Sequence, residues 1–210
     1  MNIVRREKSV VIALTGGIAC GKSKVGQYLS NHGAKVLDAD DVAHELLEQG
    51  QDTYRKILDR FGTEILRSDM SINRTLLGRR IFHDEVERKA LEGIMHPEIC
   101  KRISGWIEKN AIGYAFLVVI IPLLFELGME KESWDAIICV ASRKEIALQR
   151  LIGRGHTIQE SKERIAAQIP IEDKVSLSDF VIQNNGTLEE LRDETMERFL
   201  EFKSLYWETV

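Results

Sequence analysis

The segment from Gly16 to Ser23 carries the residue types and the spacing of a loop that holds nucleotide phosphates. It fits the pattern G-x-x-x-x-G-K-[S/T] at every fixed position. Glycines allow the backbone to curl until successive N–H groups point inward at anionic oxygens. Lys22 would reach the β- and γ-phosphates, and Ser23 would offer its hydroxyl to Mg²⁺ as the metal ligand. The pattern predicts a nucleoside triphosphate bound by Gly17, Ile18, Ala19, Cys20, Gly21, Lys22, Ser23 and Lys24.

The segments on either side of this loop are of the kinds that a phosphate loop requires. Val10–Thr15 is a short apolar run rich in β-branched residues, which is typical of a buried parallel strand. After the loop, Val25, Tyr28 and Leu29 recur at helical spacing until Gly33. The order strand, loop, helix therefore supports the phosphate-binding interpretation.

A second candidate for chemistry is a carboxylate that follows the next expected strand, Ala34–Asp38. Ligands of open parallel sheets bind at the carboxyl ends of the strands, so Asp38 would lie beside the phosphate loop. An ordinary turn residue remains an equal interpretation of the spacing. The third expected strand ends in Ile120-Ile121-Pro122 without the aspartate that many P-loop proteins use for Mg²⁺. The second acidic group is then Asp38, unless Glu126 replaces it.

The middle of the chain, from about Thr53 to Asn110, has helical periodicity and no convincing strand. Pro97 should begin or kink a helix, and it restricts His96, so we expect a loop or a helix junction there. One or two of the arginines in this region could clamp an anionic second substrate; they are Arg74, Arg79, Arg80 and Arg88.

A third group of candidates lies near a possible lid. Arg150 and Arg154 share a helix face, and Gly153 and Gly155 flank Arg154. Such a segment could close over the nucleotide, bring both arginines onto the transferring phosphate and exclude water. The alternative is an exposed basic helix end that complements the helix dipole. A further helix is expected from about Ile158.

The expected fold class is α/β, a P-loop NTPase three-layer core with a parallel five-stranded sheet. The last three strands are Phe116–Ile121, Asp135–Val140 and Phe180–Ile182. We expect one P-loop domain over residues 1–210. Its core covers about 10–50, 112–150 and 175–210, with a helical substrate-binding insertion at about 51–111 and a lid at about 151–174.

Composition indicates an ordinary soluble chain of 210 residues, with 44% hydrophobic and 30% charged residues. The formal charge of −4 argues against a general nucleic-acid coat, and the most apolar run is too short to span a membrane. The 3 cysteines have no C-x-x-C spacing, which favours reduced thiols. We expect a cytoplasmic protein with no nucleic-acid or membrane partner; the sequence does not predict its oligomeric state.

Five motifs occur in order: Leu14–Ser23, Asp38-Ala39-Asp40, His96-Pro97, Pro122-Leu123-Leu124-Phe125-Glu126 and Asp179–Gly186. Through them the chain resembles the dephospho-coenzyme A kinase family along nearly its whole length. The resemblance implies ATP- and Mg²⁺-dependent phosphorylation of the ribose 3′-hydroxyl of dephospho-coenzyme A, the last step of coenzyme A synthesis.

Residue roles follow from the same resemblance. Asp38 matches the family's catalytic aspartate and would orient the 3′-hydroxyl and accept its proton. Arg150 matches the lid arginine, so Arg150→Ala should reduce turnover more than ATP affinity. The implied catalytic residues are Asp38, Lys22, Arg150 and Arg154; Asn184 is implied at the nucleotide, and Asp38 and His96 at the substrate.

The chain departs from the family pattern at Lys24, Met70, Asn73 and Ser178. Lys24 adds a cation either beside the phosphates or on the helix surface. Met70 and Asn73 stand where a glycine and an aspartate are usual. Two other functions remain open: a different small-molecule or nucleoside monophosphate kinase, and a nucleotide-dependent switch that phosphorylates no acceptor.

Overall fold

The computed structural model describes residues 9–207 except 83 and 133. The chain forms two compact units, one made of Met1–Asp38 with Ile107–Val210 and the other of Ala39–Trp106. Within the described ranges, no helix has the length and apolar character that crossing a membrane requires.

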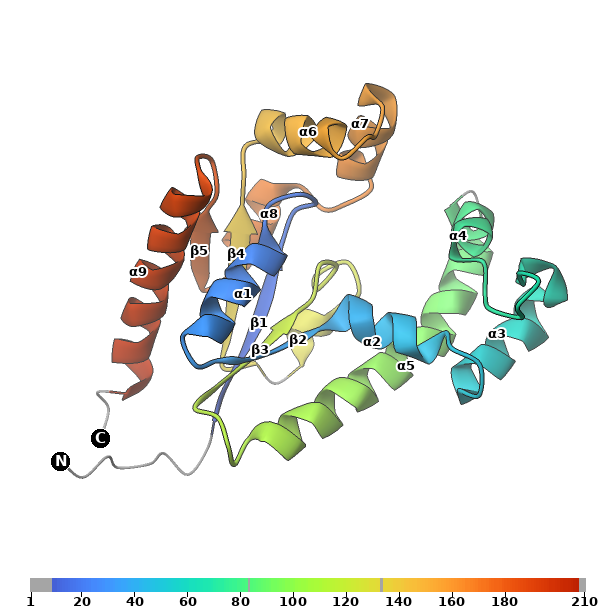
Figure 1. Ribbon diagram of the computed structural model, residues 1–210, viewed down its shortest axis with the longest axis horizontal. Helices are drawn as coiled ribbons and strands as arrows, with labels where there is room; N and C mark the ends of the chain where they lie inside the picture. The colour runs from blue at the N-terminus through green and yellow to red at the C-terminus, as the bar shows by residue number, and fades with distance from the viewer. Residues whose placement is uncertain (1–8, 83, 133, 208–210) are drawn as a thin grey trace. The chain divides into compact units, whose positions relative to one another are not determined.

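The first unit is built on a parallel sheet with the strand order β2-β3-β1-β4-β5 (Figure 1). The central strand β1 is buried along its whole length, because its residues are apolar or small and strands flank it on both sides. The predicted five-stranded parallel sheet is confirmed. The strands are β1 (Val10–Gly16), β2 (Lys35–Asp38), β3 (Phe116–Ile120), β4 (Ala136–Ala141) and β5 (Phe180–Gln183).

Helices cover both faces of this sheet. On one face, α1 (Lys22–Asn31) and α9 (Leu188–Trp207) pack on Leu14 and Phe116 in the main apolar core. Phe116 meets Phe199 edge to face, with ring centroids 5.2 Å apart. The short helix α8 (Ile171–Ser176) packs on β1 and β4. The remaining helices of this unit are α6 (Lys144–Gly153), α7 (Ile158–Ala166) and η2 (Met129–Lys131).

The second unit is helical, as the periodicity predicts. It contains α2 (Ala39–Leu46), α3 (Asp52–Phe61), η1 (Thr63–Ile65), α4 (Arg74–Phe82) and the larger part of α5 (Glu85–Asn110). One face of α3 is buried, and it includes Tyr54, Ile57 and Phe61. Apart from an isolated bridge between Leu66 and Ile72, the described part of this unit has no β-structure.

The predicted loop or helix junction at His96-Pro97 is wrong. A single helix, α5, runs from Glu85 to Asn110 with Pro97 inside it. The ribbon changes direction partway along α5 (Figure 1). Proline removes one i→i−4 hydrogen bond and crowds the preceding turn, which bends a helix without ending it when the turns on both sides are stable.

The turn before α4 contains two of the departures from the family pattern. Met70 has a φ of 66°, in the left-handed region, and its carbonyl accepts the Tyr54 hydroxyl at 2.6 Å. The Asn73 Oδ1 accepts the N–H of Leu76 at 3.1 Å, as the carboxylate of an aspartate could. Asn73 therefore keeps a helix-capping contact, whereas Met70 occupies a backbone conformation that glycine adopts at lower cost.

We predict that Met70→Gly stabilises the second unit by about 0.5–1 kcal/mol. A left-handed non-glycine residue costs about 1–2 kcal/mol, and glycine loses part of this gain through the greater freedom of the unfolded chain. Met70 is 53% exposed, so its side chain loses little packing. In urea unfolding, Met70→Gly should have a higher free energy of unfolding than the wild type and than Met70→Ala, which keeps the strained φ. The reverse order would contradict the argument.

Candidate active site

The phosphate loop connects β1 to α1, and its fixed glycines are required by neighbouring groups. Gly21 has a φ of 96°, and a Cβ on it would lie 2.4 Å from Asn184 Nδ2. Gly16 has a φ of 143°, and a Cβ there would lie 2.1 Å from the Val140 carbonyl oxygen. The tight curl of the loop therefore depends both on left-handed backbone and on close packing against β4 and the segment after β5.

The loop and the start of α1 fit an anion. The N-cap residue Gly21 has no side chain to cap the helix, and the first turn of α1 has no acidic residue. The N–H groups at a helix start carry the positive end of the helix dipole, and of the first three in α1 the one from Lys24 donates to the Gly21 carbonyl at 3.0 Å. The Lys22 ammonium donates to the carbonyls of Gly16 and Gly17, at 3.0 and 2.8 Å, which brings its charge to the loop. These groups together fit a polyphosphate.

The two residues that follow Lys22, Ser23 and Lys24, are both exposed but have different roles. Ser23 is exposed in the first turn of α1, where its hydroxyl is accessible to a metal ion. Lys24 is exposed and donates to Gln27 Oε1 at 3.1 Å. This contact places the Lys24 ammonium on the helix surface, which was one of the two positions that its sequence left open.

Asp38 lies at the carboxyl end of β2, on the same edge of the sheet as the phosphate loop. It is opposite Ile120 of β3, and Ile120 is opposite Leu14 of β1. Adjacent strands lie about 4.8 Å apart, so the backbones of β2 and β1 are about 10 Å apart. Asp38 is partly buried. This spacing leaves room between the loop and the carboxylate for a terminal phosphoryl group and an acceptor hydroxyl.

Glu126, the alternative acidic group, is already paired. Its Oε1 lies 2.7 Å from the ammonium of Lys174 and accepts the N–H of Ile169 at 3.1 Å. Lys174 has no exposed surface and also donates to the carbonyl of Pro122 at 3.0 Å. The Glu126 carboxylate therefore compensates a buried cation, which leaves Asp38 as the acidic candidate.

Arg150 and Asn184 hold the back of the phosphate loop. The Arg150 guanidinium donates to Ala19 O at 3.3 Å, Ser142 Oγ at 3.0 Å and Asn184 Oδ1 at 2.9 Å. The Asn184 amide donates in turn to Cys20 O at 2.8 Å and is 4% exposed. The predicted site residues Arg150 and Asn184 are thus brought to the loop, where they bind its outward-facing carbonyls.

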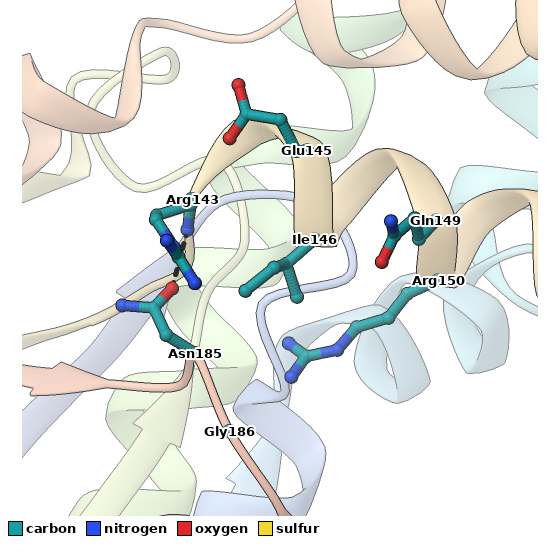
Figure 2. Close-up of a pocket in the computed structure, with 7 residues that line it drawn as sticks. All are labelled: Arg143, Glu145, Ile146, Gln149, Arg150, Asn185 and Gly186. Atoms are coloured by element: carbon teal, nitrogen blue, oxygen red, sulfur yellow. Dashed lines mark hydrogen bonds between the residues drawn. The ribbon is translucent and has the colours of Figure 1, made fainter.

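A pocket of about 750 Å³ lies beside this network (Figure 2). It lies between α6 and the segment after β5. These two segments are joined by a hydrogen bond from the Arg143 N–H to Asn185 Oδ1, at 2.8 Å. Most residues of its lining could not be predicted from the sequence, because these residue types are common at helix starts and turns. Only the Asn-Gly after β5 could have indicated a turn here. The lining residues are Arg143, Glu145, Ile146, Gln149, Arg150, Asn185 and Gly186.

The expected lid segment starts where α6 ends. Gly155 has a φ of 91°, and Thr157 begins α7 with a capping box closed by Glu160. Hydrogen bonds from the Thr157 N–H and hydroxyl lower the pKa of the Glu160 carboxyl. Arg154 is exposed, and its side chain makes no ion pair or hydrogen bond with the residues that the structure describes. Its guanidinium is accessible to a ligand.

Cys20 and His96 are the remaining predicted site residues. Cys20 and Cys139 are buried, and burial raises the pKa of the Cys139 thiol to about 12. His96 lies on α5 in the second unit, with its Nε2 3.6 Å from Cys100 Sγ. Across the described ranges, no cluster of three His, Cys, Asp or Glu side chains could hold a metal. An ion held by Ser23 would therefore need oxygens from the nucleotide, as Mg²⁺ sites of this kind have.

We predict that Lys174→Met destabilises the protein by about 3–5 kcal/mol, because Glu126 is left as an uncompensated, largely buried charge. The double variant Lys174→Met/Glu126→Gln should recover a large part of this loss. Lys89→Met, which breaks the exposed pair with Glu85, is the control and should change stability by less than about 1 kcal/mol. Chemical unfolding checks all three, and a single variant as stable as Lys89→Met would refute the argument.

Comparisons with known proteins agree with this geometry. The sequence model of the family described as dephospho-CoA kinase matches residues 10–190. A dephospho-CoA kinase of Geobacillus kaustophilus is 42% identical over 189 residues, covering 88% of this chain and 92% of that protein.

Two solved structures are also similar. The protein TT1252 of Thermus thermophilus superposes with a TM-score of 0.80 at 29% identity, covering 93% of this chain and 98% of that one. A dephospho-CoA kinase of Campylobacter jejuni superposes with a TM-score of 0.66 at 31% identity, covering 91% and 96%. With a phosphate loop, an aspartate on the same sheet edge and this match over most of its length, the chain belongs to the dephospho-CoA kinase family.

Proposed function

We propose that this kinase transfers the γ-phosphoryl group of ATP to the ribose 3′-hydroxyl of dephospho-coenzyme A, giving coenzyme A and ADP. The observation that carries the proposal is the placement of the phosphate loop and Asp38 on one sheet edge, about 10 Å apart, in a chain of this family. That spacing suits a reaction between a nucleotide on β1 and a hydroxyl beside β2.

The phosphate loop is proposed to bind the triphosphate of ATP. The N–H groups of Ile18, Cys20 and Lys24 bond within the protein. The other N–H groups of the loop and of the start of α1 would surround the β-phosphate, and Lys22 would bind β- and γ-oxygens. Ser23 would hold Mg²⁺, which neutralises charge on the phosphates when it is bound. The pocket beside Arg150 has an apolar side chain, Ile146, and amide groups at its edge, so we assign it to the nucleoside.

Asp38 is proposed to orient the acceptor hydroxyl and to take its proton. Phosphoryl transfer has a loose transition state, so placing the nucleophile in line with the phosphorus atom matters more than early proton removal. A carboxylate fixed at the end of a strand can do this, because the sheet holds its backbone.

The acceptor and lid assignments extend this proposal. The helical region at about 51–111, with His96, would bind the coenzyme, and the segment at about 151–174 would close as a lid. The three free cysteines fit a reducing compartment, and we propose a cytoplasmic enzyme on that ground.

We predict that Asp38→Asn lowers kcat by about 10²- to 10⁴-fold, because the amide keeps the size of the side chain but cannot accept the proton. The Kd for ATP should stay within about threefold of the wild type, since the phosphates bind to the loop on β1. Asp41→Asn is the control, because Asp41 is exposed on α2. Steady-state kinetics and calorimetry check the pair, and near-normal turnover of Asp38→Asn would remove the catalytic role.

The two arginines should have separable effects. The sequence led us to expect that Arg150→Ala reduces turnover more than ATP affinity. In the structure Arg150 makes three hydrogen bonds around the loop, so we now expect the Kd for ATP to rise about tenfold or more and kcat to fall as well. Arg154→Ala removes an exposed guanidinium and should lower kcat by about 10²- to 10³-fold with little change in the Kd. Calorimetric titration with ATP beside turnover assays distinguishes the two; equal effects on Kd would contradict the assignment.

The direct test is to incubate the protein with Mg²⁺, ATP and dephospho-coenzyme A and to follow coenzyme A by mass spectrometry. Adenosine, AMP, UMP and shikimate serve as competing acceptors, and EDTA should abolish the reaction. Preferential formation of coenzyme A supports the proposal. Phosphorylation of another acceptor alone would mean a different small-molecule kinase, and no phosphorylation at all would favour a nucleotide-dependent switch.

A further inference from the structure

Gln168 makes a contact with the phosphate loop across 150 positions of sequence. Its side-chain Oε1 accepts the N–H of Ile18 at 2.8 Å. Ile18 belongs to the first half of the loop, and Gln168 follows α7 in the later part of the expected lid segment. One amide side chain thus connects that segment directly to the backbone that faces the nucleotide.

The residues after Gln168 are fixed to the core by buried polar contacts. The next N–H, of Ile169, donates to Glu126 Oε1 at 3.1 Å. Glu126 pairs with the fully buried Lys174, and Lys174 also donates to Pro122 O. Breaking such a pair exposes a buried charge to an apolar environment, so this end of the segment has little freedom to move.

The part of the segment before Gln168 has fewer ties to the core. Most residues of α7 are exposed, and the helix begins with its own capping box. A pocket of about 270 Å³ separates the loop from the end of α7; Gly17 and Ile18 line one side, and Ile165 and Gln168 line the other. Gln168 crosses from α7 to the loop at the edge of this space, next to the point where the segment becomes fixed.

We propose that Gln168 is a positioning residue for phosphoryl transfer, which rests on the kinase function proposed above. Gln168 accepts the Ile18 N–H, and the Glu126–Lys174 pair holds the chain next to Gln168 in place. Together these contacts fix the position of the first half of the phosphate loop relative to the lid. Arg154, which lies in the lid, then meets the transferring phosphoryl group, and water stays out of the space between lid and loop. Gln168 acts through the loop backbone and the lid.

The test compares three variants. Gln168→Met keeps the length of the side chain but lacks the acceptor oxygen, whereas Gln168→Glu keeps an oxygen for the Ile18 N–H. Gln159→Met is the matched control, since Gln159 lies exposed on α7 and its side chain donates to Glu163 Oε1 on the same helix, at 2.6 Å. We expect Gln168→Met to lower kcat about two- to tenfold and to raise the ratio of ATP hydrolysed to acceptor phosphorylated, with the KM for the acceptor unchanged.

A second readout does not depend on the identity of the acceptor. Hydrogen exchange of the Ile18 amide, followed by NMR on ¹⁵N-labelled protein, should be at least about tenfold faster in Gln168→Met, and near the wild-type rate in Gln168→Glu and Gln159→Met. If the wild type forms no coenzyme A, the proposed function fails, and this exchange still tests the contact.

The outcomes are distinct. Faster Ile18 exchange together with more uncoupled hydrolysis in Gln168→Met alone supports the positioning role. Unchanged exchange, an unchanged ratio of hydrolysis to transfer, or equal effects of Gln168→Met and Gln159→Met would each overturn it.

Discussion

The site depends on one constraint of the phosphate-loop backbone. When successive N–H groups turn inward to face an anion, the carbonyl groups of the same peptides must turn outward, and each needs a donor. Here Lys22 donates to Gly16 O and Gly17 O, Arg150 to Ala19 O, and Asn184 to Cys20 O. Four carbonyls of the loop therefore have side-chain donors, and one of those donors, Lys22, is also the cation proposed to bind the phosphates.

These donors come from separate parts of the chain, which the parallel sheet brings to one edge. Lys22 starts α1, Arg150 lies on α6 after β4, and Asn184 follows β5. Every strand of the sheet runs in the same direction, so all of these segments emerge at the carboxyl ends of β1, β4 and β5. The strand order thus determines which side chains can reach the loop.

The sequence predicted the elements whose signals are local. The strand, loop and helix around Gly16–Ser23 each have their own pattern, and the predicted end of a short strand at Asp38, which made it a candidate, is where β2 ends. Pro97 was misjudged, because a single residue cannot indicate whether the turns on both sides are stable enough to continue the helix. Lys174 gave no signal, since its burial results from a distant carboxylate at Glu126.

The sequence also could not show what Arg150 and Lys174 do, because their roles depend on the groups that surround them in the fold. Arg150 binds a backbone carbonyl, a hydroxyl and an amide, all of them neutral, so its positive charge remains available to a nearby anion. Lys174 is fully buried and is neutralised by the Glu126 carboxylate. A charge that is to act on phosphate keeps neutral partners, whereas a charge that only connects segments needs an opposite one. Arginine and lysine both carry a positive charge at neutral pH, and only the fold distinguishes these two uses.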